Sequence, residues 1–293
     1  MKKYVSIILS LMMTMVLLTG CGGNDKAADS GKVSTTPSIT KAATLTPAPT
    51  GSAGDQIGST EVYVFIAASL SNAMKEVAEL YHASQPNVKI TYNADSSGTL
   101  MTQIQEGAEC DLFFSAAKKQ MTTLTEGGLI EPDSSKDLLK NKVVLIKPKN
   151  GKTEVTSFED VSKAKNIALA AEGVPAGDYA RDIFKNLGIW DKVSKMEINE
   201  GSNVTAVLTA VSEASNEIGV VYESDAVSVK DSVEILATAA DTSLTKPVVY
   251  PVAQVVNKEA DDTQKKAAKD FLAFLSTDEV LKIFEKYGFT VNK

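Results

Sequence analysis

Four short stretches of the sequence place hydroxyl-bearing or small residues where an apolar strand is expected to pass into a helix. These stretches contain Ser69, Ser96-Ser97-Gly98, Ala176-Gly177 and Ser202-Asn203. The first N–H groups of a helix lack an intrahelical acceptor and lie at the positive end of the helix dipole. Several such ends at one point can bind an anion without a basic side chain, and serine hydroxyls add donors. The pattern favours a small-anion site, although the same residue types also cap helices that bind nothing.

The elements that would bring these stretches together follow from hydrophobic periodicity. From Glu61 onward, short apolar runs alternate with amphipathic segments, which is typical of an α/β fold with mainly parallel strands. Strands are expected at residues 62–67, 88–93, 111–115, 142–147, 167–170, 196–199, 219–222, 233–237 and 248–256. Helices are expected near 70–84, 99–107, 117–126, 135–139, 157–162, 176–187, 204–214, 261–276 and 277–287. Ligands of such folds bind at the carboxyl ends of the strands, where the four stretches lie.

The length of 293 residues is about right for two lobes, each with its own core. We expect residues 60–141 and 249–293 to form the first lobe and residues 142–248 to form the second. The apolar strands near 142–148 and 248–256 would cross between the lobes. Two crossing strands make a hinge with a cleft between the lobes.

The N-terminus has the features of an export signal. Lys2 and Lys3 precede an apolar run at residues 5–18 that is too short for a comfortable membrane span. Small residues then lead to Cys21, so residues 1–20 read as a lipoprotein signal peptide and Cys21 as the lipidated residue. A plain secretory signal with an incidental cysteine is the alternative. Residues 21–60 have the composition of a disordered tether, which predicts a lipid-anchored protein on the extracytoplasmic face of the cell membrane.

Charge and residue content exclude several other functions. Thirty Lys and Arg against 37 Asp and Glu give a net charge of −7, which argues against nucleic acid as a partner. The single histidine, His82, and the second cysteine, Cys110, form no cluster for a soft metal. A serine hydrolase that uses Ser69 or Ser97 is disfavoured, because His82 is expected at the end of a helix, away from the four stretches, and no G-x-S-x-G motif occurs.

Several motifs make the interpretation more specific. The segments VFIAASLSNAM, GAECDLFFSA, EGVPAGDYARDIFKNLGIWD, IGVVYESDAV, VVYPVA and EKYGF closely resemble, in this order, the molybdate-binding proteins of bacterial ABC importers. The resemblance runs from Val62 to Phe289. It implies a two-lobed fold of the type II periplasmic-binding-protein kind, with the ligand in the cleft between the lobes. It also implies a monomer without enzymatic activity or cofactor, which binds molybdate for an ABC permease of the membrane. Tungstate is nearly the same size as molybdate, so we expect it to bind as well.

The resemblance also implies a set of ligand-binding residues. It assigns side-chain hydroxyls to Ser69, to Ser97 and to Tyr222, with Ser96 as the alternative to Ser97. It assigns backbone N–H groups to Ala176 and Val204. Two positions depart from the family pattern: Gly98 stands where serine is frequent, and Asn203 replaces an acid before Val204. A lipoprotein for another oxyanion such as sulfate, or one without a small ligand, remains the alternative.

Overall fold

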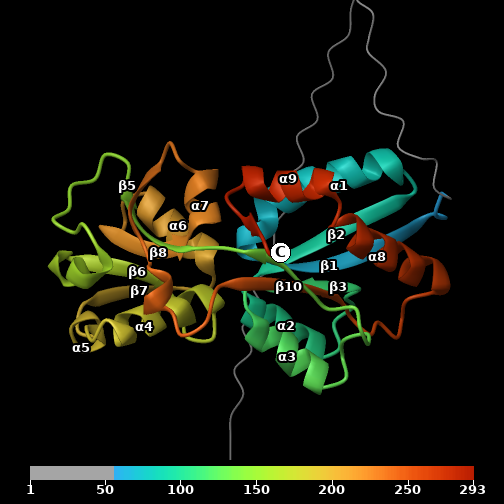
Figure 1. Ribbon diagram of the computed structural model, residues 1–293, viewed down its shortest axis with the longest axis horizontal. Helices are drawn as coiled ribbons and strands as arrows, with labels where there is room; N and C mark the ends of the chain where they lie inside the picture. Colours follow the sequence, from blue (N-terminus) through green and yellow to red (C-terminus); the bar gives the residue numbers. More distant parts are fainter. Residues whose placement is uncertain (1–55) are drawn as a thin grey trace, which may run out of the picture. The chain divides into compact units, whose positions relative to one another are not determined.

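A computed structural model describes residues 56–293, which form two β-sheets flanked by helices (Figure 1). The six-stranded sheet has the order β11-β4-β10-β3-β1-β2, and the five-stranded sheet has the order β7-β6-β8-β5-β9. The expected α/β class is therefore confirmed. The expected signal peptide, Cys21 and most of the tether lie outside the described residues. Within residues 56–293, no helix combines the length and the apolar character that a membrane crossing requires.

The six-stranded sheet is covered on both faces. Its strands are β1 (Thr60–Ala67), β2 (Val88–Asp95), β3 (Leu112–Phe114), β4 (Lys136–Lys140), β10 (Val249–Gln254) and β11 (Thr290–Val291). Helices α2 (Ser97–Gln105) and α3 (Lys118–Glu126) pack on one face, against Phe65 and Phe113. Helices α1 (Ser71–Ser84), α8 (Asp262–Phe274) and α9 (Asp278–Lys286) cover the opposite face (Figure 1). Val64 and Ile66 belong to the hydrophobic core on that side. This alternation buries both sides of β1.

The five-stranded sheet contains β5 (Val143–Pro148), β6 (Asn166–Ala170), β7 (Glu197–Gly201), β8 (Ile218–Tyr222) and β9 (Val233–Thr238). Its helices are α4 (Pro175–Asn186), α5 (Trp190–Val193), α6 (Val204–Ser212) and α7 (Glu223–Ser228). Helix α6 packs closely on β8, because Gly219 leaves room for the side chains of Val207 and Val211. Three short 3₁₀ helices complete the described part: η1 (Ala68–Leu70), η2 (Phe158–Lys163) and η3 (Asp241–Ser243).

Both sheets are mixed, and the expectation of mainly parallel strands holds only within β2-β1-β3 and β7-β6-β8. Strand β10 brings the chain back from the five-stranded sheet, and it runs antiparallel to both of its neighbours. Strand β5 brings the chain in the other direction and is also antiparallel to both neighbours. The two connections lie together, since the N–H of Asn141 donates to the carbonyl of Val248 at 3.2 Å.

One expected helix is wrong. Residues 135–139 were expected to be helical, but Lys136–Lys140 is strand β4, which pairs with β10 on one side and β11 on the other. The segment is too short for periodicity to separate helix from strand, so its pairing partners decide. The segment expected to be helical at 157–162 is the 3₁₀ helix η2, and the short elements β11, α5 and α7 were not expected.

Candidate anion-binding site

The structure brings all five expected ligand residues to one pocket. Ser69, Ser97, Ala176, Val204 and Tyr222 line it together with Ala67, Ala68, Asp95, Ser96, Ala116, Val174 and Pro175. These residues come from the ends of strands in both sheets and from the helix starts that follow them. About 210 Å³ of space that no protein atom fills lies at the pocket, and this volume includes space open to solvent. The geometry therefore unites stretches that lie more than a hundred residues apart in the sequence.

Ser69 lies on the single 3₁₀ turn that joins β1 to α1. Its side chain is buried, and its Oγ lies 2.8 Å from the hydroxyl oxygen of Tyr250 on β10. The next turn is closed by Ser71, whose hydroxyl donates to the carbonyl of Ala68 at 2.7 Å. Ser71, the first residue of α1, therefore uses its hydroxyl proton within this turn, whereas Ser69 lines the pocket.

The two serines at the start of α2 have different roles. Ser96 is the N-cap: its Oγ accepts from the N–H of Thr99 at 3.1 Å and pairs with the Thr99 hydroxyl at 2.8 Å. Ser97 accepts at its Oγ a hydrogen bond of 2.9 Å from the N–H of Ala116. Within residues 56–293, the Ser97 hydroxyl proton has no protein acceptor. Ser97 therefore keeps a donor for the pocket, and Ser96 uses its hydroxyl to cap the helix.

The remaining two helix starts offer backbone donors. Pro175 begins α4, and Ala176 is its second residue, so the Ala176 N–H has no acceptor four residues earlier in the helix. Gly177 lets the first turn of α4 pack closely against the end of β6, because a Cβ there would overlap the carbonyl oxygens of Ala170 and Ala171. Val204 is the first residue of α6, after the N-cap Asn203, whose Oδ1 accepts from the Ala206 N–H at 3.0 Å.

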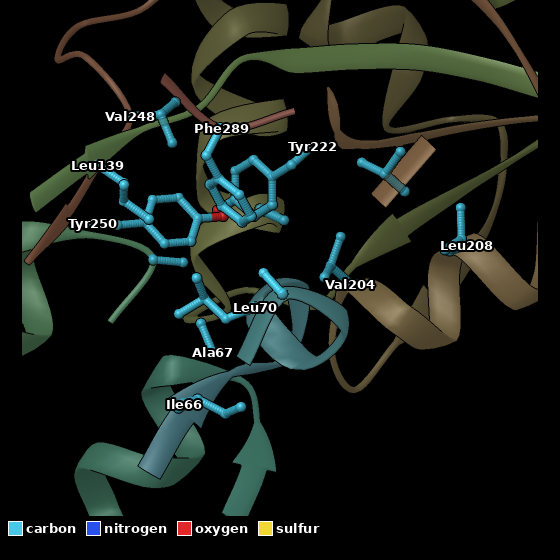
Figure 2. Close-up of a cluster of buried hydrophobic side chains, with 14 of the residues drawn as sticks. Ile66, Ala67, Leu70, Leu139, Val204, Leu208, Tyr222, Val248, Tyr250 and Phe289 are labelled. Atoms are coloured by element: carbon cyan, nitrogen blue, oxygen red, sulfur yellow. The ribbon is translucent and has the colours of Figure 1, made fainter. Parts of the chain in front are cut away.

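Tyr222 ends β8 and is the most informative residue of the pocket. It is 1% exposed, and its ring lies next to the ring of Tyr250 (Figure 2). The two rings pack edge-on, and their centroids are 5.7 Å apart. Within the described part of the chain, its hydroxyl is buried and has no hydrogen-bond partner. Burial raises the pKa of Tyr222 well above its usual value, so the group remains a donor. A buried hydroxyl without a partner costs about 1–3 kcal/mol, which marks a place for an acceptor from a ligand.

The charge of the pocket is unusual for an anion site. Of the pocket-lining residues that the structure describes, none is Lys, Arg or His, and the one ionisable acid is Asp95. Its Oδ1 accepts from the N–H of Ser96 at 2.7 Å and from the Asn203 side-chain amide at 3.0 Å. Sequence reasoning did not single out Asp95, although it lies directly before the Ser96-Ser97 stretch. In residues 56–293, no group of three His, Cys, Asp or Glu side chains is placed to hold a metal ion.

Two mixed sheets with a pocket between their strand ends are typical of the α/β solute-binding proteins. The chain belongs to the bacterial extracellular solute-binding protein family, which matches residues 62–290. The expected membership of a solute-binding family is thereby confirmed.

Individual relatives agree with this assignment. The chain is 38% identical, over 99% of its length and 98% of the relative's, to YvgL of Bacillus subtilis, named as a candidate ABC transporter substrate-binding lipoprotein. It is 36% identical to the molybdate-binding protein ModA of Haemophilus influenzae, over 79% of this chain and 91% of that one. A solved structure, the substrate-binding domain of a candidate molybdenum ABC transporter from Clostridium difficile, superposes with a TM-score of 0.61 at 36% identity. That similarity covers 80% of this chain and 99% of the other.

Proposed function

We propose that the protein binds molybdate outside the cytoplasm, tungstate as well, and delivers it to an ABC importer. The observation that carries this proposal is the buried Tyr222 hydroxyl, which has no partner in the described residues and lines a pocket of donors. The choice of molybdate as the anion is supported by the names of relatives at 36% and 33% identity, both molybdate-binding proteins.

The proposed ligand set consists of Ser69, Ser97 and Tyr222 through their hydroxyls and of Ala176 and Val204 through their N–H groups. A tetrahedral dianion loses its hydration shell on entering such a pocket, and directed donors replace the water. The same set disfavours phosphate at neutral pH, because a ligand O–H would meet donors and find no acceptor. Discrimination between molybdate and the smaller sulfate then depends on the size of the closed pocket.

We also propose how the protein is held and how it moves. Lipidation of Cys21 after removal of residues 1–20 would anchor a monomer to the membrane through the tether of residues 21–60. The two lobes, residues 60–141 with 249–293 and residues 142–248, would close on the anion about the paired connections near Asn141 and Val248. The closed form would then be the one that the permease recognises.

The test is calorimetric titration of the purified protein with molybdate, tungstate, sulfate and phosphate, together with thermal unfolding in each anion. Binding to the native state alone must raise the unfolding midpoint by mass action. We expect molybdate and tungstate to bind and to raise the midpoint, and sulfate and phosphate to have little effect. Preferential binding of sulfate would keep the anion pocket and refute the molybdate assignment, whereas no binding of any oxyanion would refute both.

A further inference from the structure

A chain of buried hydrogen bonds behind the pocket fixes which way the Ser69 hydroxyl points its proton. The chain runs from Asn141, between β4 and β5, through Tyr250 on β10 to Ser69. Asn141, Tyr250 and Ser69 are at most 8% exposed, and neither Asn141 nor Tyr250 lines the pocket. We infer that Asn141 and Tyr250 are positioning residues, which commit Ser69 to donate to the bound oxyanion. This inference deepens the proposed function and rests on it.

The direction of the chain is set at its far end by a backbone group. The Oδ1 of Asn141 accepts from the N–H of Lys142 at 2.9 Å, and an N–H can only donate. The amide oxygen of Asn141 is therefore fixed on that side, and its Nδ2 group points to the hydroxyls of Ser224, at 2.9 Å, and Tyr250, at 3.2 Å. Both hydrogens of the amide are thus used, and Tyr250 receives one of them.

The next link follows from counting donors at Tyr250. Its oxygen accepts from Asn141, and its own proton needs an acceptor, since burial raises the pKa of Tyr250 well above its usual value. Within residues 56–293, the Ser69 Oγ at 2.8 Å is the acceptor available to that proton. Tyr250 therefore donates to Ser69. The proton of Ser69 is not used in this bond, and it is free to point into the pocket.

Ser97 repeats the arrangement with a different donor. The N–H of Ala116 donates to its Oγ at 2.9 Å, so the Ser97 proton also remains for the pocket. A serine hydroxyl can rotate and act as donor or acceptor, but a fixed donor behind it removes much of that choice. Two serines held in this way present protons to a fully deprotonated oxyanion and oppose a ligand O–H.

The test is a double-mutant cycle on the full-length protein, with molybdate as the probe and calorimetry as the readout. Tyr250→Phe keeps the ring that packs on Tyr222 and Phe289 and removes only the hydroxyl. We expect a rise in the molybdate Kd of about tenfold for Tyr250→Phe and of at least that size for Ser69→Ala. In the Ser69→Ala background, Tyr250→Phe should change Kd by less than about twofold, because its target is gone.

Tyr81→Phe is the matched control, since Tyr81 is equally buried and its hydroxyl donates to Asp270 at 2.9 Å, away from the pocket. It should leave the molybdate Kd unchanged. Thermal unfolding of each variant tests whether it is folded. If Tyr250→Phe fails to fold, Asn141→Ser takes its place in the same cycle, because Asn141 is the residue that donates to Tyr250. Additive effects of Tyr250→Phe and Ser69→Ala on Kd, or an unchanged Kd in Tyr250→Phe, would overturn the inference. The proposed function would still stand in that case, provided that the wild type binds molybdate. Failure of the wild type to bind molybdate would instead refute the proposed function.

Discussion

Replacing Tyr222 by phenylalanine is expected to weaken molybdate binding. The substitution removes one oxygen from the pocket and leaves the ring, which packs against Tyr250 and Tyr179 with centroids 5.7 and 6.5 Å away. A hydrogen bond to a charged acceptor contributes about 1.5–3 kcal/mol. If the Tyr222 hydroxyl donates to the dianion, its loss should raise the molybdate Kd by about 10- to 150-fold.

The same substitution should not destabilise the ligand-free protein. The hydroxyl is buried and has no partner within residues 56–293, so the folded chain loses no internal hydrogen bond when the oxygen is removed. Relief of an unpaired buried hydroxyl stabilises a protein by about 1 kcal/mol or more. For a body of this size, about 1 kcal/mol corresponds to a rise of about 2–4 °C in the unfolding midpoint. Affinity and stability are therefore expected to change in opposite senses.

Two measurements on one preparation test this prediction. Calorimetric titration gives the molybdate Kd, and a thermal scan without anion gives the unfolding midpoint. Tyr81→Phe serves as the comparison, because removal of its bond to Asp270 should lower the midpoint and leave the affinity unchanged. The reasoning is refuted if Tyr222→Phe binds molybdate as the wild type does, or if its ligand-free midpoint falls, since the hydroxyl would then have a protein partner.

Three further perturbations have expected outcomes. A Cβ at Gly98 would lie 2.6 Å from the carbonyl oxygen of Gly173, and ordinary van der Waals contact begins at 3.4 Å. The two groups would therefore have to separate by about 3.4 − 2.6 = 0.8 Å, so Gly98→Ala should hold the two sides of the pocket apart. Its molybdate Kd should rise while its unfolding midpoint without anion stays near the wild-type value, and calorimetry would contradict the idea by finding unchanged affinity. Burial raises the pKa of Asp225 to about 7, against about 3.9 in an unfolded chain. The folded state holds this proton more tightly, so the stability that Asp225 contributes is present below about pH 4 and is lost as the pH rises through about 7. Asp225→Asn should therefore lose less stability than the wild type between pH 5 and pH 8. Urea unfolding at the two pH values measures the free energy of unfolding, and an equal loss in wild type and variant would disprove the prediction. Cys21→Ser should move the protein from the membrane fraction to the soluble fraction of a cell lysate, and retention in the membrane fraction would point to another anchor.

The sequence predicts the parts of the site that depend on local structure. Helix starts can be recognised from small and hydroxyl residues before an apolar helical period, and this signal indicated the stretches at Ser69, Ser96-Ser97, Ala176 and Ser202-Asn203, each of which lies in or next to the pocket. The choice of Ser97 and Val204 as ligand residues came from the resemblance. Tyr222 was found through the resemblance to a family, because a tyrosine at a strand end has no local signature of binding. Their roles as ligands stay predictions, whereas their place around one pocket is a finding.

The parts that escaped prediction depend on contacts distant in sequence. The bond between Ser69 and Tyr250 joins residues 181 positions apart, and the bond between Asp95 and Asn203 joins residues 108 positions apart. No period or spacing in the chain encodes such a pair. Strand β4 illustrates the same limit for secondary structure, since its five residues owe their conformation to pairing with β10 and β11.

Asp95 is an acidic residue in a pocket that is proposed to bind an anion, and its hydrogen bonds show what it does there. Its carboxylate lies where it would repel a dianion, yet it accepts from the Ser96 N–H and from the Asn203 amide, which spread its charge over two donors. Asn203 caps α6 through its Oδ1 and reaches Asp95 through its Nδ2, so this one side chain ties the start of α6 to the end of β2. The tie brings the Val204 N–H to the same pocket as Ser97. The negative charge of Asp95 would reduce the attraction of the pocket for every anion to a similar extent. Its bonds to Ser96 and Asn203 also hold the two helix starts in place, and the choice between anions of different size would depend on that spacing.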